Sequence, residues 1–288
     1  MKRPPSRLRL VADADEPLLS FVLRRGGISQ EQALRAIAGG GAFVGGKRVR
    51  EAERALHRGD RVEVALQQAQ AAPLTREQLI HLDGSVLAVD KPAGVAAQED
   101  LAGGAALPDL CSALLRSLGE KDAQALLVHR LDRGTTGVTV LARTARAQAA
   151  LLEEFRAHRA AKEYRALVLG APAGDEGAVE SPVESRRART RWRLLERYGM
   201  AAEIAAFPET GRTHQIRIHL RELGCPLLGD KAYGGPSFLT RKDGLRHDIE
   251  RPLLHALSLS LRHPDGGDLR LLAPLPADFR EAQDFLRR

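Results

Sequence analysis

One stretch of the sequence, His129-Arg-Leu-Asp-Arg-Gly-Thr-Thr-Gly-Val138, predicts both a local fold and a chemical site. It places one carboxylate, Asp132, between Arg130 and Arg133, and an apolar run at 138–141 follows a Gly-Thr-Thr-Gly turn. Nearby guanidinium groups favour the ionised form of a carboxyl group, and glycine lets a backbone turn sharply and approach a ligand closely. We therefore expect a single anionic group at the floor of a cleft, directly before a buried strand. The alternative is a solvated Asp–Arg pair in a surface loop.

The composition describes a globular protein with an anionic partner. The chain has 288 residues, of which 43% are hydrophobic and 28% are charged, and its net charge is +7. The basic excess lies toward the N-terminus, because residues 1–68 contain 13 Lys and Arg against 8 Asp and Glu. Nucleic acid is the simplest partner for such a charge. Solubility alone is the alternative explanation.

Cysteine usage and hydropathy predict the compartment. The two cysteines, Cys111 and Cys225, lie far apart and outside any metal-ligand spacing, which favours a reducing environment. The segment 1–10 is basic but lacks the apolar stretch of a signal peptide, and no apolar run is long enough to span a membrane. We expect a cytoplasmic protein that has no membrane association and is a monomer.

The sequence pattern divides the chain into four segments. These are a basic flexible tail at 1–10, a small module at 11–68, a linker at 69–80 and a large domain at 81–288. The Gln- and Ala-rich composition before Pro73 is typical of a linker.

The small module is predicted to contain two short helices followed by a hairpin and a strand. Ser29 and Gln32 have the spacing of a capping box at the start of the second helix. Three glycines at 39–41 end this helix. Gly45-Gly46 fits the two-residue turn of a hairpin, and a strand is expected at 61–66.

This order of elements resembles the small RNA-binding module first seen in a ribosomal small-subunit protein. The resemblance covers about residues 11–66 and departs from the usual pattern in one respect, because the second helix carries Arg35 as its only basic residue. Lys47 and Arg48 are the residues expected to contact phosphates, a role that sets affinity rather than sequence choice. A docking or folding role for the module is the alternative.

The larger domain is predicted to alternate buried strands with amphipathic helices. Strands are expected at 86–89, 138–142 and 161–168, helices at 108–118 and 144–157, and a mobile flap at 96–108.

Two further stretches are interpreted as strands with charged faces. Alternation at 186–197 places three guanidinium groups on one face, which predicts either a phosphate-binding face or a solvated one, and these belong to Arg189, Arg191 and Arg193. In a strand at 210–220, Arg212 and Ile216 would share one face, while Arg217 would lie on the other.

An ordered set of motifs within residues 86–275 resembles the RluA-type RNA pseudouridine synthases. The motifs are VDKPAGV, VHRLDRGTTGV, AKEYRALVLG, GRTHQIRIHL with PLLGDKAYG, and LLHALSLSLRHP. The resemblance implies an α+β fold in which the catalytic domain has a long mixed, largely antiparallel sheet and flanking helices, beside a small N-terminal α/β RNA-binding module. One departure is the sequence at 96–100, where many relatives have a His-Pro step.

The resemblance also implies roles for individual residues. Asp132 matches the essential aspartate, and Arg212 matches the arginine that pairs with it. Tyr164 matches the tyrosine that stacks on the flipped base and helps in proton transfer, while Arg130 matches the residue that fills the gap left by the target uridine. Apolar pocket walls are expected from Ile216 and Leu254. The other residues expected to contact RNA are Arg133, Lys162, Arg217, Lys47 and Arg48.

The chemistry of pseudouridine formation agrees with this set of residues. The reaction breaks the C1′–N1 bond, rotates the uracil and joins C1′ to C5, so it asks for one carboxylate near the ribose and for no metal or nucleotide cofactor. Whether Asp132 adds covalently or removes a proton stays open. The target must be flipped out of structured RNA. Because of the N-terminal module, ribosomal RNA of the large subunit is expected ahead of transfer RNA.

Three other interpretations compete with this one. A non-catalytic RNA-binding or ribosome-assembly factor would have no chemical reason to keep Asp132, Tyr164 and Arg212 together. A hydrolase with Asp132 as its nucleophile would lack a second carboxylate to activate water. A metal centre is not supported by the spacing of the histidines, of which His214 and His255 are expected to be hydrogen-bonded structural residues; the others are His129 and His219.

Overall fold

The computed structural model describes residues 7–65, 72–98, 105–241 and 243–288. The chain forms two compact units, one of residues 1–73 with 98–106 and one of residues 74–97 with 107–288. Parts of the predicted tail, linker and flap, at 1–6, 69–71 and 99–104, lie outside the described residues. None of the helices within the described ranges is long and apolar enough to cross a membrane.

The smaller unit is a four-stranded antiparallel sheet with two helices. Its sheet has the order β1 (Arg7–Val11), β6 (Arg61–Ala65), β3 (Ala42–Val44) and β4 (Lys47–Val49). The helices are α1 (Leu18–Gly26) and α2 (Gln30–Ala38), and a short ladder joins β2 (Glu16–Pro17) to β5 (Ala55–Leu56). The prediction of a flexible tail is wrong for residues 7–10, because these pair with β6.

Two local features of the smaller unit that were predicted from the sequence are confirmed, the cap of α2 and the glycine turn. The capping box is present, since Gln32 N donates to Ser29 Oγ at 3.2 Å and Ser29 N donates to Gln32 Oε1 at 3.0 Å. Gly45 and Gly46 adopt φ values of 57° and 79°, which the turn between β3 and β4 requires. Apolar side chains of both helices and of the sheet form one core, which includes Phe21, Val22, Ala33, Ile37, Val62 and Val64.

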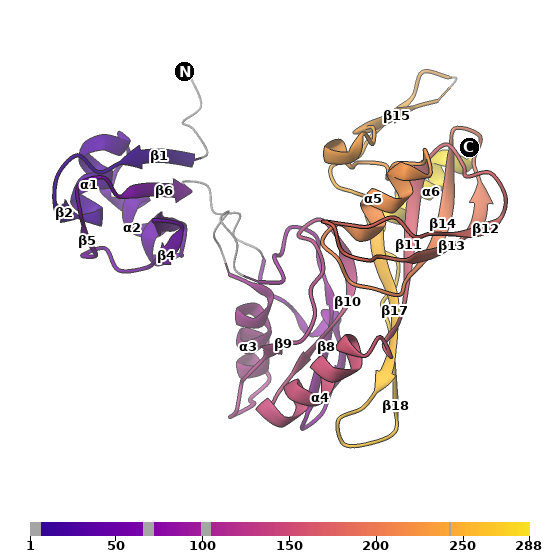
Figure 1. Cartoon of the computed structure of the whole chain (residues 1–288), viewed down its shortest axis with the longest axis horizontal. Coiled ribbons are helices and arrows are strands. Elements are labelled where there is room, and N and C mark those ends of the chain that lie inside the picture. The colour runs from indigo at the N-terminus through magenta and orange to yellow at the C-terminus, as the bar shows by residue number, and fades with distance from the viewer. Residues whose placement is uncertain (1–6, 66–71, 99–104, 242) are drawn as a thin grey trace. The chain divides into compact units, whose positions relative to one another are not determined.

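The larger unit contains a ten-stranded mixed sheet (Figure 1). Its main path has the order β12 (Glu176–Val179), β13 (Thr190–Arg197), β14 (Ala201–Pro208), β11 (Ala161–Leu169), β17 (Leu254–Arg262), β10 (Thr136–Ala142), β8 (Val86–Lys91) and β7 (Leu79–Leu82). In addition, β18 (Asp268–Leu272) pairs with β17, and β9 (Leu126–Leu127) pairs with β10. Of its pairings, β10 with β17 is parallel and the others are antiparallel, which confirms the predicted sheet.

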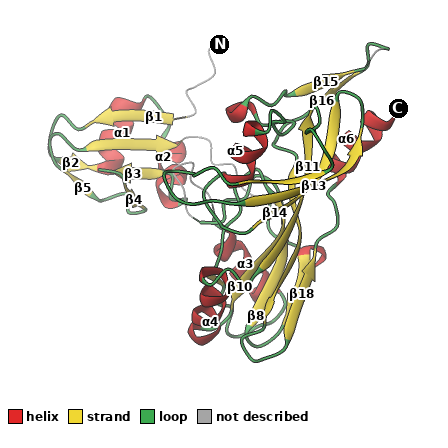
Figure 2. Cartoon of the chain, turned by 45° about the vertical axis from the view of Figure 1, so that its right-hand side comes forward, coloured by secondary structure: helices red, strands yellow, loops and turns green. Residues whose placement is uncertain are grey.

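Helices cover both ends of this sheet. Figures 1 and 2 show α3 (Leu107–Ser117) and α4 (Ala145–Arg156) beside the β8 and β10 end, and α5 (Gln215–Glu222) and α6 (Ala277–Arg287) beside the β11 to β14 end. On β11, Ala166 and Val168 pack in a cluster with α5, whereas Leu167 packs with α6. Alternate residues of one strand therefore face the two helices from opposite sides of the sheet.

Two predictions about the larger unit have clear outcomes. The helices expected at 108–118 and 144–157 are confirmed within a residue or two. The strand expected at 210–220 is wrong, because α5 begins at Gln215. The short elements that complete this unit are β15 (Phe238–Thr240), β16 (Arg246–Asp248) and two 3₁₀ turns at Arg76–Gln78 and Lys231–Tyr233.

Candidate active site

A cavity of about 560 Å³ lies in the larger unit. The loop before β10, the end of α4, strand β11, the loop after β14 and the first turn of α5 supply its lining. Eight of the residues predicted from the sequence meet there: Asp132, Tyr164, Arg212, Arg130, Lys162, Arg217, Ile216 and Leu254. A volume of this size is ordinary for a small-molecule or nucleotide pocket.

Hydrogen bonds to β8 and to the segment after it hold the loop that carries Asp132. Thr135 N donates to Asp132 O at 3.0 Å, which closes a turn. The loop is joined to the segment after β8 in both directions, because Gly94 N donates to Arg133 O and Arg133 Nη1 donates to Gly94 O, each at 2.9 Å. The fully buried Lys91 ammonium donates to Val95 O at 2.9 Å and to Arg133 O at 3.3 Å. Arg133 therefore supports the loop and is not part of the cavity lining.

Arg217 is the arginine that pairs with Asp132. Its Nη1 donates to Asp132 Oδ2 at 3.2 Å, and its Nε and Nη2 donate to the two carboxylate oxygens of Asp230 at 2.7 and 2.8 Å. Asp230 is almost fully buried, and the Arg217 guanidinium lies 4.8 Å from the ring centroid of Tyr233. Such a bidentate pair fixes the direction of the remaining N–H group. Arg217 is thus a buried partner of the aspartate rather than a surface residue.

The prediction that Arg212 pairs with Asp132 is wrong. Arg212 lines the cavity, but its Nε donates to Arg187 O at 3.2 Å. The error comes from interpreting 210–220 as a strand, which puts Arg212 and Arg217 on opposite faces. In a helix that begins at Gln215, the third residue of the first turn, Arg217, is directed at the loop of Asp132.

Gln215 fixes the loop that precedes α5. Its side-chain oxygen accepts from Thr210 Oγ1 at 2.6 Å and from Arg212 N at 3.0 Å, and its Nε2 donates to Arg189 O at 2.9 Å. Because all these groups are part-buried or buried, the amide replaces hydrogen bonds that the loop would otherwise make with water. A glutamine at the first position of a helix gives no signal for such a role in the sequence.

His214 also lies beside Asp132. It has left-handed backbone geometry with φ 56° at the start of α5, and its Nε2 is 3.8 Å from Asp132 Oδ2. Its Nδ1 shares a hydrogen bond of 2.9 Å with the Tyr233 hydroxyl. The prediction of a hydrogen-bonded histidine is confirmed here and at His255, which bonds to Thr136 Oγ1 at 2.9 Å. The position of His214 next to the aspartate was not predicted.

Tyr164 and Lys162 lie on β11 and line the same cavity. Burial raises the pKa of the Tyr164 phenol and the charge of Asp132 raises it further, so the phenol is protonated at neutral pH. Burial lowers the pKa of Lys162 to about 8, and its ammonium donates to Thr210 O at 3.2 Å. At the mouth of the cavity, Arg130 is exposed and its Nη2 donates to Thr213 Oγ1 at 2.5 Å.

The end of α4 forms a wall that was not predicted. Its contribution consists of Leu152, Phe155, Arg156 and the following His158. The ring of His129 stacks on that of Phe155 with centroids 4.6 Å apart. Burial lowers the pKa of His129 to about 3, and Val140 N donates to its Nε2, so the imidazole is neutral. The amphipathic pattern of α4 indicates only a buried face and gives no sign that its last turn reaches a pocket.

The other basic residues that the sequence predicted to contact phosphates lie outside the cavity. Lys47 is exposed on β4 of the smaller unit, and the Arg48 guanidinium lies 5.2 Å from the ring centroid of Phe43. Arg189, directly before β13, and Arg191, on β13, both pair with Glu209, at 2.6 and 3.0 Å. These ion pairs favour the solvated face over a phosphate-binding face.

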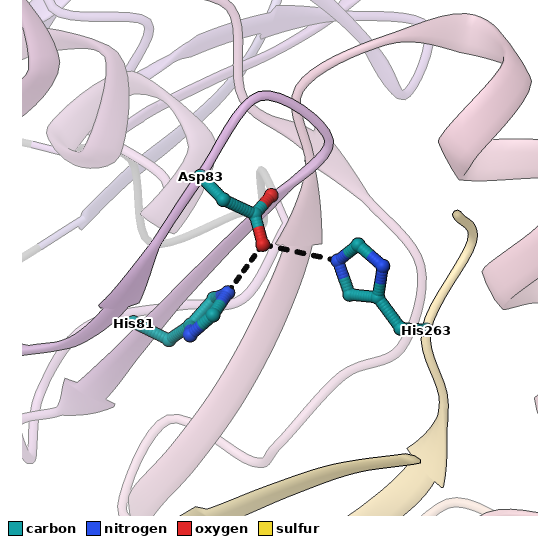
Figure 3. Close-up of side chains that lie close together, drawn as sticks. All are labelled: His81, Asp83 and His263. Atoms are coloured by element: carbon teal, nitrogen blue, oxygen red, sulfur yellow. Dashed lines mark hydrogen bonds and ion pairs between the residues drawn. The ribbon is translucent and has the colours of Figure 1, made fainter. Parts of the chain in front are cut away.

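A cluster of two histidines and an aspartate lies at the turns of two hairpins of the larger unit (Figure 3). Asp83 Oδ2 accepts from His81 Nε2 at 2.5 Å and from His263 Nε2 at 3.0 Å. Asp265 N donates to His263 Nδ1, so the proton of a neutral His263 is on Nε2, where a metal would need a lone pair. Burial would raise the pKa of Asp83, but hydrogen bonds from His81 and the turn outweigh it and lower the pKa to about 2. These contacts describe a hydrogen-bonded link between the β7–β8 and β17–β18 hairpins.

Comparison with known proteins finds RNA pseudouridine synthases both by sequence and by structure. Residues 85–222 match the family model described as RNA pseudouridylate synthase. The chain is 35% identical to ribosomal large subunit pseudouridine synthase D of Xanthomonas campestris, over 87% of this chain and 82% of that protein. It is 36% identical to an uncharacterized RNA pseudouridine synthase of Mycobacterium bovis, over 73% and 72% of the two chains.

A solved structure shares the fold. The human RNA pseudouridylate synthase domain containing 4 protein superposes with a TM-score of 0.60 at 25% identity, over 73% of this chain and 93% of that chain. The region that matches the family model contains Asp132 and every lining residue of the cavity except Leu254, and the sequence match to the Xanthomonas protein extends over most of the chain. The chain therefore belongs to the RluA-type family of RNA pseudouridine synthases, and it is an isomerase that acts on uridines in RNA.

Proposed function

We propose that this enzyme converts specific uridines of large-subunit ribosomal RNA to pseudouridine, with Asp132 as the group that acts on the ribose. The observation that carries the proposal is the chain of contacts from Asp230 through Arg217 to Asp132, inside the cavity that Tyr164 lines. Relatives from Xanthomonas campestris, Nitrosomonas europaea and Pseudomonas aeruginosa are named as large-subunit synthases, which supports ribosomal RNA as the substrate.

Arg217 gives Asp132 a defined direction before substrate enters. Its guanidinium is held on one edge by Asp230 and presents Nη1 to the catalytic carboxylate. A positioned carboxylate is what the reaction needs, whether it adds to C1′ or removes a proton from C2′. The chemistry contains no redox or phosphoryl-transfer step, so we propose a mechanism without a cofactor.

The cavity is suited to a base that has left its helix. Ile216 and Leu254 supply apolar walls with exposures of 6% and 3%, and Tyr164 offers a flat ring, for which base stacking contributes about 1–3 kcal/mol. Flipping a nucleotide out of structured RNA costs a few kcal/mol. We propose that Arg130, at the exposed mouth, occupies the space that the uridine leaves.

The smaller unit supports capture of RNA rather than chemistry. Lys47 and Arg48 follow the glycine turn of the β3–β4 hairpin, and we propose that they contact phosphates. Cys111 and Cys225 are buried free thiols, which fits the cytoplasm as the place of action.

The proposal is tested by mapping pseudouridine in ribosomal and transfer RNA transcripts that have been incubated with the protein. An Asp132→Asn variant, which keeps the shape of the side chain, serves as the control. We expect a new pseudouridine at defined positions of large-subunit RNA with the wild type and none with the variant. Product on partly assembled ribosomal particles alone would change the substrate but keep the chemistry. Tight binding without product on any RNA would favour a non-catalytic assembly factor.

A further inference from the structure

Lys162 differs from the other cations of the cavity in its surroundings. It lies on β11 two residues before Tyr164, and its side chain is largely buried in the cavity wall. Its ammonium donates to the Thr210 carbonyl at 3.2 Å. Among the residues that the structure describes, no carboxylate lies within ion-pair distance of this ammonium. Lys162 is thus a mostly buried positive charge that has a neutral acceptor and lacks a counter-ion.

Such a charge is unfavourable unless something compensates it. An ion taken out of water loses hydration that one neutral acceptor does not replace. Arg217 shows the compensated case, because it contacts both Asp230 and Asp132. At Lys162 burial lowers the pKa to about 8. A site that keeps an uncompensated cation in this position is prepared for an anion that is absent from the free protein.

The reaction creates an anion in this cavity. When the C1′–N1 bond breaks, its electron pair stays on the uracil, and the negative charge spreads over N1, O2 and O4. The sugar carbon is taken up by Asp132, or the sugar loses its C2′ proton to Asp132, and the uracil leaves as an anion in both cases. C5 then bonds to C1′, and in the same step either the bond between C1′ and Asp132 breaks or C2′ takes its proton back from Asp132. C5 loses its proton and N1 gains one, so the product is an isomer of the substrate. The protonated Tyr164 phenol can offer this anion a dipole but no charge.

We propose that the Lys162 ammonium is a catalytic group that stabilises the detached uracil anion. The inference rests on the proposed function of the cavity. A lysine suits a base that must rotate, because its ammonium is a compact charge with three freely turning donors, whereas an arginine fork prefers one planar orientation. The step needs no proton transfer from Lys162, so atoms and charges balance without a further reactant.

The other ionisable groups of the cavity are consistent with this role. Tyr164 lines the cavity from the same strand. The other elements contribute one carboxylate, Asp132, together with the neutral His129 and with Arg130, Arg156, His158, Arg212, His214 and Arg217. None of the described groups neutralises the ammonium by direct pairing. The rate of the chemical step should therefore decrease above pH about 8, where the ammonium loses its proton.

The test compares Lys162→Met and Lys162→Arg with Lys121→Met, which changes an exposed lysine of the same unit. Single-turnover rates are measured with protein in saturating excess over the RNA, and the Kd for the same RNA and the melting temperature are measured in parallel. We expect Lys162→Met to lower the single-turnover rate by about 10²- to 10³-fold and to leave Kd nearly unchanged. Its melting temperature should be equal to or above that of the wild type, because an unpaired buried charge is removed.

Lys162→Arg should retain part of the rate and lose the decrease above pH about 8, since a guanidinium does not deprotonate there. The inference is overturned if Lys162→Met has the wild-type single-turnover rate, or if its only defect is a weaker Kd, which would make Lys162 a phosphate contact. It is also overturned if Lys162→Arg keeps the wild-type pH profile. Absence of product with the wild-type protein would instead contradict the proposed function itself.

Discussion

Asp132 is held by an arginine that lies 85 positions further along the chain. Arg217 reaches it because Asp230 binds the other edge of the same guanidinium and because α5 starts two residues earlier. The sequence contains all three residues within recognisable motifs. Which arginine pairs with the aspartate depends on the local helix, and two arginines only five positions apart could not be distinguished by their types.

Replacing Arg217 by lysine should be far more harmful than the same change at Arg212. An ammonium cannot bind Asp230 in a bidentate manner and contact Asp132 at once, so Asp132 loses its direction. We expect Arg217→Lys to lower the single-turnover rate by at least about 100-fold and Arg212→Lys to lower it by less than about tenfold. Equal losses in the two variants would contradict the assignment of Arg217 as the partner of Asp132.

Two neutral histidines, the half-buried His129 and the fully buried His255, predict how stability depends on pH. Burial lowers the pKa of His129 to about 3 and that of His255 to about 4, both from 6.5. Below pH 6.5 the unfolded chain therefore binds protons that the folded chain does not, and the free energy of unfolding should decrease as the pH falls toward about 4, by up to about 1.4 kcal/mol per pH unit for each histidine.

Fluorescence of Trp192, the chain's single tryptophan, reports urea unfolding of the larger unit over this pH range. Burial raises the pKa of Asp90 to about 6, so this group makes the free energy of unfolding increase as the pH falls, opposite to the effect of the histidines. The pH dependence of the wild type is therefore compared with that of His129→Gln. A variant whose pH dependence equals that of the wild type would show that His129 titrates normally in the folded protein.

The strand after Asp132 begins where two backbones approach closely. Gly137 has φ 111° on β10, and a Cβ at this position would lie 2.2 Å from the Ala256 carbonyl oxygen of β17. This is the one parallel pairing of the described sheet, and it brings Leu254 to the cavity beside the Asp132 loop. The glycine thus determines how near the two strands can come.

Gly137→Ala should therefore destabilise the protein by about 3 kcal/mol, through strain and overpacking together. Gly84→Ala is the matched control, since a Cβ there meets no atom within 4 Å and its φ is not positive. Melting temperatures of the two variants measure the effect. A Gly137→Ala protein that melts with the wild type would mean that β10 and β17 are not held at this distance.

Elements with a clear periodicity or cap were predictable from sequence. The capping box at Ser29, the glycine turn at 45–46 and the amphipathic helix α4 need only neighbouring residues, so their patterns are sufficient. The helix α5 was not predictable, because its alternating polar and apolar residues fit a strand equally well. Its conformation is decided by hydrogen bonds of Gln215 to residues more than 20 positions earlier.

The molecule combines two units with different expected tasks. The larger unit carries every residue of the cavity, and the smaller unit carries Lys47 and Arg48. The order of the motifs allowed this division to be predicted, together with the mixed sheet. The pairing of β1 with β6 was not predicted, because the basic residues of 7–9 concealed an alternating strand.

A variant that carries both Lys47→Ser and Arg48→Gln should therefore bind RNA more weakly without a change in the rate of the chemical step. We expect weaker RNA binding and a plot of log Kd against log salt whose slope falls by about 2, because each of the two side chains neutralises one phosphate in the wild-type complex. The single-turnover rate at saturating protein should match the wild type. An unchanged salt dependence would show that the two residues do not bind RNA.

Release of tritium from large-subunit ribosomal RNA labelled at C5 of its uridines tests the role of Asp132 most directly, because C5 gives up its hydrogen when it bonds to C1′. We predict release by the wild-type protein and, with Asp132→Asn, a loss of release while binding to the same RNA is retained. Release by Asp132→Asn at the wild-type rate would show that the chemistry does not depend on this carboxylate and would contradict the proposed mechanism.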